Sequence, residues 1–81
     1  MEVDIKRRDI WLGRRGDPEW CALARALRRQ TGRPWRVAPG TATDIRHGVV
    51  HRLTPEADQW FQRFDRKAPV HPGRLTVWLA D

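Results

Sequence analysis

Residues 17–32 read DPEWCALARALRRQTG, and the rest of the chain can be arranged around this stretch. Aspartate, proline and glutamate in this order are typical of a helix start, and a glycine such as Gly32 is typical of a helix end. Between them, apolar residues recur at the spacing of one helical face, namely Trp20, Leu23, Ala24 and Leu27. The pattern predicts a helix over residues 18–31 with an apolar side that packs on a sheet and a side rich in arginine that faces solvent or a partner.

Short segments on both sides of this helix predict β-strands. Polar and apolar residues alternate at residues 2–6 and 74–79, as they do in half-buried strands. In the second of these segments, the alternation points Leu79 inward and Trp78 outward, beside Arg74. Three further strands are expected at residues 35–38, 43–46 and 49–53.

A second helix is predicted over residues 55–67. A capping hydroxyl, a proline and an acid open it at Thr54, and apolar residues then recur at helical spacing, namely Ala57, Trp60, Phe61 and Phe64. Residues 7–16 are expected to form a loop with an apolar anchor at Ile10, Trp11 and Leu12. The order β-α-β-β-β-α-β predicts one small α+β domain over residues 1–81, with two helices on one face of a mainly antiparallel sheet. The aromatic residues of both helices, and Trp35, are expected in its core.

The composition favours a soluble protein. The chain has 81 residues and a single cysteine, so an intramolecular disulfide is excluded and packing alone must stabilise the core. No apolar run approaches the roughly 20 residues that span a bilayer, and the N-terminus lacks the apolar segment of a signal peptide. We therefore expect a cytoplasmic protein without membrane contacts.

Positive charge is concentrated in the first half of the chain. The net charge is +6, with 14 arginines and 2 lysines against 10 acidic residues. Five arginines and no carboxylate lie between Trp20 and Thr43. Such a one-sided basic field indicates an anionic partner, although it could also be a solvated surface or the product of a GC-rich genome.

Motifs along most of the chain resemble those of a widespread group of small bacteriophage and prophage proteins. The resemblance rests on Asp9-Ile10 before a glycine, Cys21 before Ala22-Leu23-Ala24, Leu53-Thr54-Pro55-Glu56-Ala57, Phe61, Phe64-Asp65, and Val70 with Pro72. The chain departs from the group at Ala22, where a proline is common, and at Arg66-Lys67, where a glycine is common. The resemblance implies a phage accessory protein in the host cytoplasm. It transfers no catalytic residue, because the group has no established activity.

The sequence holds no constellation typical of an enzyme, a metal site or a cofactor site. His47 and His51 fall in a predicted strand, where positions four apart are about 13 Å from each other and cannot share one ion. Cys21 has Arg25 and Arg28 as helical neighbours, which would lower the pKa of an exposed thiol. It could equally be a small buried apolar residue.

A non-catalytic binding surface is the remaining prediction. A tryptophan among arginines on an open sheet face suits a stacked base with its phosphates held by guanidinium groups. Cover by residues 7–16 or contact with another subunit are the alternatives for this tryptophan. The candidate ligand-binding residues are Arg25, Arg28, Arg29, Arg36, Arg52, Arg74 and Trp78.

Two functions fit these residues. The first is binding of a nucleotide signal or a nucleic acid on behalf of a phage against host defence. A domain this small would then be expected to build a nucleotide pocket between subunits of a homo-oligomer. The second is inhibition of a host defence or transcription enzyme by direct contact, since arginine and tryptophan are enriched at binding hot spots.

Overall fold

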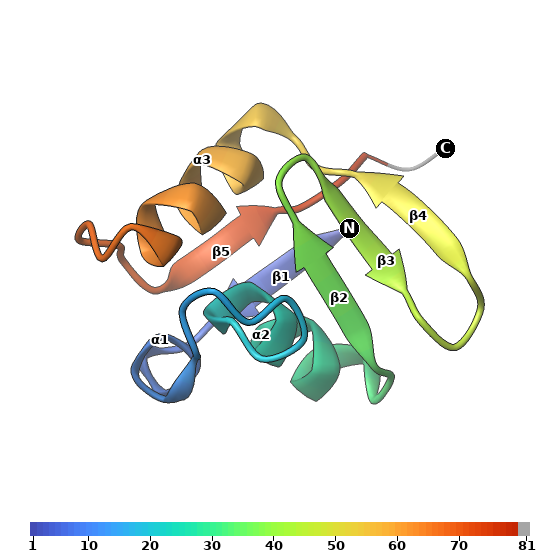
Figure 1. The fold of residues 1–81 in the computed structure, drawn as a ribbon, viewed down its shortest axis with the longest axis horizontal. Helices are drawn as coiled ribbons and strands as arrows, with labels where there is room; N and C mark the ends of the chain where they lie inside the picture. Colours follow the sequence, from blue (N-terminus) through green and yellow to red (C-terminus); the bar gives the residue numbers. More distant parts are fainter. Residues whose placement is uncertain (80–81) are drawn as a thin grey trace.

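Five strands and three helices make up residues 1–79, the part of the chain that the computed structural model describes (Figure 1). They are β1 (Glu2–Ile5), α1 (Arg7–Leu12), α2 (Ala22–Thr31), β2 (Trp35–Ala38), β3 (Thr41–Asp44), β4 (Val49–Arg52), α3 (Pro55–Asp65) and β5 (Gly73–Thr76). The α+β class is confirmed, and so is the order of the predicted elements, to which the structure adds α1.

The strands form two antiparallel sheets. β1 pairs with β5, with Val3 opposite Leu75, and β2, β3 and β4 form a three-stranded sheet in sequence order. In Figure 1 the β1–β5 pair lies between α3 and α2, and the three-stranded sheet lies to its right. The sequence predicted a single sheet, and the structure has two.

The last strand is shorter than predicted. It ends at Thr76. The Val77 N–H still follows the β1–β5 register and donates to the Met1 carbonyl over 2.9 Å, but the Val77 carbonyl leaves the ladder and accepts from Thr54 N–H over 2.8 Å. The predicted alternation therefore stops, and Leu79, expected to point inward, is exposed.

The core lies between the two sheets and the apolar sides of α2 and α3. Leu23 and Leu27 of α2 are buried together with Phe61 and Phe64 of α3, as predicted. Trp60 is only partly buried and donates from its indole N–H to the carbonyl of His71 over 3.1 Å. Trp35 of β2 is fully buried, in agreement with the sequence analysis.

The helix predicted over residues 18–31 begins later, at Ala22. Asp17 closes a separate turn, because its carboxylate accepts from Glu19 N–H over 3.0 Å and its carbonyl accepts from Cys21 N–H over 2.9 Å. Trp20 belongs to this turn and not to the helical face. Its predicted place in the core is wrong, since 43% of it is exposed.

The end of α2 agrees with the sequence. Gly32 has a left-handed backbone with φ of 71°, and its N–H donates to the Arg28 carbonyl over 2.8 Å. α3 begins as predicted, with Thr54 Oγ1 accepting from Ala57 N–H over 3.1 Å, and it ends at Asp65, two residues early. β3 lies two residues earlier than predicted.

Residues 7–16, predicted to be a loop, contain the short helix α1. Asp9 organises it: the carboxylate accepts from Lys6 N–H over 2.9 Å, and the carbonyl accepts from Gly13 N–H over 3.0 Å. A Cβ on Gly13 would lie 2.6 Å from the main-chain nitrogen of Ala22, so only glycine allows α1 to approach α2 this closely. Six residues are too few for an apolar period to reveal such a helix.

We expect Leu27→Ala to lower the free energy of unfolding by about 2–5 kcal/mol, because it leaves a cavity where α2 meets both sheets. Urea denaturation followed by circular dichroism measures this change. Leu12→Ala is the control, because that side chain is exposed and its loss should cost less than about 0.5 kcal/mol. Equal effects of the two substitutions would show that α2 does not organise the core.

Candidate functional site

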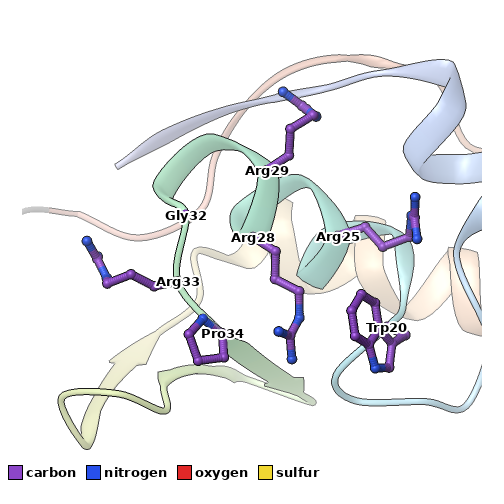
Figure 2. A pocket seen from close by; sticks show the side chains of 7 residues that line it. All are labelled: Trp20, Arg25, Arg28, Arg29, Gly32, Arg33 and Pro34. Atoms are coloured by element: carbon purple, nitrogen blue, oxygen red, sulfur yellow. The ribbon is translucent and has the colours of Figure 1, made fainter.

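Three of the arginines predicted to bind a ligand lie on α2, and their side chains diverge. Figure 2 shows Arg29 directed away from Arg28, with Arg25 and Arg28 extending on either side of Trp20. Their guanidinium groups therefore do not converge on one ligand, and the contacts of each decide whether it is available.

Arg29 is held inside the fold. Its Nη2 donates to the Asp9 carboxylate over 2.8 Å and to the Asp4 carbonyl over 2.6 Å. The Asp9 side chain is only 3% exposed, and its hydrogen bond raises the pKa of Arg29 above the ordinary value. Moving Arg29 to a ligand would leave a buried carboxylate without its cation, so Arg29 is a structural residue.

Arg28 connects the Asp17 turn with β2. Its Nε donates to the Glu19 carbonyl over 2.9 Å, and its Nη2 reaches the Trp35 carbonyl at 3.4 Å and the Glu19 carboxylate at 3.5 Å. The guanidinium carbon also lies 4.3 Å from the ring centroid of Trp20. Arg28 therefore covers one face of that indole and holds it in place.

Arg33, in the same basic field, is bound to Asp44. Its Nε lies 3.0 Å from the Asp44 carboxylate, which also contacts His47 Nδ1 at 2.9 Å. Burial by itself would raise the pKa of Asp44, but the hydrogen bonds from His47 and the charge of Arg33 outweigh it and hold this pKa below its ordinary value. The basic field is thus largely paired, although no carboxylate occurs within it in sequence.

Asp44→Asn should make the free energy of unfolding less dependent on pH in the acid range. A carboxyl group with a lowered pKa in the folded state stabilises the fold above its unfolded pKa of about 3.9, and this contribution disappears as the pH falls through the folded value. The variant should be less stable than the native chain at pH 7 and should lose less stability between pH 5 and pH 2. Urea denaturation across this range measures both effects.

The exposed Asp4→Asn substitution is the control, and we expect the native acid dependence from it. An Asp44→Asn variant whose stability falls with acid as steeply as the native chain would contradict the pairing of Asp44.

Arg25 is the arginine of α2 that the described residues leave without a partner. Its Nε is buried and has no hydrogen-bond acceptor within residues 1–79. Trp20 and Arg25 together line two neighbouring surface hollows. One, of about 430 Å³, is drawn in Figure 2 and is completed by Arg28, Arg29, Gly32, Arg33 and Pro34. The other, of about 480 Å³, is completed by Leu12 and Arg14.

We call these two hollows, with Leu12, Arg14, Trp20 and Arg25, the Trp20 site. Its lining combines an exposed indole, an exposed leucine and five arginines, of which Arg14 and Arg25 make no ion pair within residues 1–79, with no carboxylate. Apolar surface and positive charge therefore occur together, which is the chemistry of a site for an anion that carries a flat ring.

The remaining predicted residues lie elsewhere. Arg36 and Arg52 share the outer face of the three-stranded sheet, because the register aligns Arg36 with Val50 and Arg52 lies two residues beyond Val50. Arg74 belongs to the other sheet and lies 3.6 Å from the Glu2 carboxylate. The seven candidates therefore do not form a single site.

Trp78, predicted to face outward, is buried. Its ring stacks on His51, with centroids 4.1 Å apart, and lies 5.1 Å from the ring of Trp35. Only 9% of Trp78 is exposed. Trp78 is therefore packed within the fold, and its neighbours are Trp35 of β2 and His51 of β4, not residues 7–16 as one alternative had it. Trp78 lines a hollow with His51 and Arg52, but it exposes too little of its ring to serve as a stacking platform.

Cys21 is the only cysteine, and it is fully buried. Burial raises the pKa of its thiol to about 11, so the group is protonated at neutral pH and is not an activated nucleophile. Within residues 1–79, no three histidine, cysteine or acidic side chains are grouped to hold a metal ion. None of the described helices has the length and apolar character needed to cross a membrane.

Comparisons of the chain with protein-family models, with curated proteins and with solved structures found no match. The function is therefore inferred from the chemistry of the side chains. Sequence reasoning missed Trp20, Leu12 and Arg14. The available signal was Asp17-Pro18-Glu19, which is as typical of a closed turn as of a helix start. A turn would have placed Trp20 at the surface.

Proposed function

We propose that the protein is a non-catalytic binder of a nucleotide or a nucleic acid, held at the Trp20 site. The observation that carries the proposal is the unpartnered Arg25 beside the exposed Trp20, between two hollows without acidic lining. In the phage setting that the sequence resemblance implies, such binding would act against host defence.

Trp20 is suited to contact the base. Arg28 already covers one face of the indole, so a ligand ring would stack on the part that stays exposed, with Leu12 as a further apolar contact. Arg28 also makes the indole rigid before the ligand arrives, which lowers the entropy cost of stacking. A stacked base contributes about 1–3 kcal/mol without regard to sequence.

Arg25 is suited to contact the phosphate. The Nη groups of Arg25 have no hydrogen-bond partner within residues 1–79 and can offer two N–H groups to a phosphate, whereas Arg29 would first have to leave a buried carboxylate. Arg14 lines the same hollow and can hold a second anionic oxygen. The exposed base contact and the free cation thus lie within one site.

Trp20→Ala should weaken binding of a short single-stranded oligonucleotide by about 1–3 kcal/mol, while Trp20→Phe should retain most of the affinity. Arg25→Gln should weaken it too and should reduce the slope of log K against log salt by about 0.7, the value for one phosphate contact on a single strand. Calorimetric titration at several salt concentrations measures both quantities, and linear and cyclic nucleotides are tested in parallel.

The matched control is Arg66→Gln at the exposed end of α3, which removes the same charge far from the site in sequence. It should leave the affinity almost unchanged. The salt slope of Trp20→Ala should equal that of the native chain, because no phosphate contact is lost. If no oligonucleotide or nucleotide binds at low salt, or if Arg66→Gln weakens binding as much as Arg25→Gln, the proposal is wrong.

A further inference from the structure

The main-chain groups on the outer edge of β1 are bonded within the chain. Asp4 N–H donates to Gln30 Oε1 over 3.1 Å, and Gln30 Nε2 donates to the Glu2 carbonyl over 2.8 Å. Arg29 donates a hydrogen bond to the Asp4 carbonyl. Side chains of α2 therefore replace a neighbouring strand.

Two other edges are covered in part. The Thr54 hydroxyl donates to the Thr76 carbonyl of β5 over 2.7 Å. On β2, Val37 N–H donates to the Pro18 carbonyl over 2.8 Å, and Arg28 approaches the Trp35 carbonyl. Native proteins cover sheet edges in this way because bare edges attract other strands.

β4 is the described edge strand on which no outward main-chain group is bonded. Leu53 N–H donates to the Gly40 carbonyl over 2.9 Å. In an antiparallel pair, residues whose main-chain groups bond the partner strand alternate with residues whose groups point away from it, so this bond fixes which residues of β4 face β3. The main-chain groups of Val49 and His51 then point toward β3, and those of Val50 and Arg52 point outward. No hydrogen bond within residues 1–79 uses the outward groups, and Figure 1 shows β4 at the margin of the molecule.

The side chains around this edge are apolar and positive. Val50 is 62% exposed, and Val49 is exposed as well. Arg36 and Arg52 stand on the same outer face as Val50. Within residues 33–53 the only carboxylate belongs to Asp44, which is buried against Arg33 and His47. The edge therefore presents hydrogen-bonding groups, a valine and uncompensated positive charge.

We propose that β4 binds an extended acidic segment of a partner protein, which adds to the three-stranded sheet as a fourth strand. The main chain of the segment would pair with Val50 and Arg52, and its acidic side chains would lie against Arg52 and Arg36. This surface is separate from the Trp20 site and does not depend on nucleotide binding.

Charge and hydrogen bonding select this occupant over two others. A second copy of β4 would bring another Arg52, with Arg46 of the preceding turn, to the edge with no carboxylate to offset them. A nucleic acid backbone offers acceptors to the outward N–H groups but few donors to the outward carbonyls. A strand from another protein supplies both, and acidic side chains supply the missing charge.

The test uses a blocked seven-residue peptide of alternating valine and glutamate, and the same peptide with lysine for glutamate. At millimolar peptide, we expect the glutamate peptide to shift the amide signals of Val50 and Arg52 in nitrogen-15 NMR spectra and to slow their hydrogen exchange. The lysine peptide should bind about tenfold or more weakly, because it places like charges on Arg52.

Two substitutions separate the main-chain contact from the charge. Val50→Pro removes an N–H that β3 does not use and should abolish binding of the glutamate peptide, since proline is tolerated on edge strands. Arg52→Glu, on an exposed side chain, should reverse the preference and favour the lysine peptide. Arg66→Glu on α3 makes the same charge change and should alter neither peptide's binding.

Several results would overturn the proposal. These are no shift at Val50 and Arg52 with the glutamate peptide at millimolar concentration, equal binding of the two peptides, or unchanged binding in Arg52→Glu. Concentration-dependent self-association that Val50→Pro removes would show instead that a second copy covers β4. Shifts at these amides caused by an oligonucleotide would assign the edge to nucleic acid.

Discussion

The pairing of Arg29 with the buried carboxylate of Asp9 is the contact on which the first half of the fold depends. Asp9 begins α1 by accepting from Lys6 N–H, and Arg29 extends from α2 to hold both Asp9 and the Asp4 carbonyl of β1. Three elements therefore meet at one buried charge. Loss of either partner would leave an ion or a main-chain group unsatisfied, which costs far more than an exposed ion pair contributes.

The contacts of the arginines divide them into structural and available groups. Arg28, Arg29 and Arg33 each bind a carboxylate or a carbonyl of the chain itself. Arg25 has a buried Nε with no acceptor within residues 1–79, and it lines both hollows together with the exposed Trp20. The polar side of α2 thus stabilises the fold along β1 and is open to a ligand only near the Asp17 turn.

Two surfaces emerge that suit different partners. The Trp20 site offers cations and an indole, which matches an anion with a flat ring but provides no acceptor for a peptide main chain. The β4 edge offers alternating donors and acceptors, which match an extended strand. Both surfaces are positive, in keeping with the net charge of +6. The two proposed partners are therefore both negatively charged, but one carries a flat ring and the other an extended main chain.

The sequence by itself determined the elements with strong local signals. Thr54 and Gly32 cap their helices as expected, the apolar spacing of Leu23 and Leu27 placed them in the core, and the α+β class followed from the order of segments. Only the tertiary structure decided the rest, because it depends on contacts distant in sequence. Arg29 of α2 binds Asp9 of α1, and the Val77 carbonyl leaves the β1–β5 ladder to accept from Thr54 N–H, next to the buried Trp78. Trp20 reaches the surface because Asp17 closes a turn at a position where the sequence predicted a helix. The ion pairs of Asp9, Glu19 and Asp44 with arginines decide which arginines stay free.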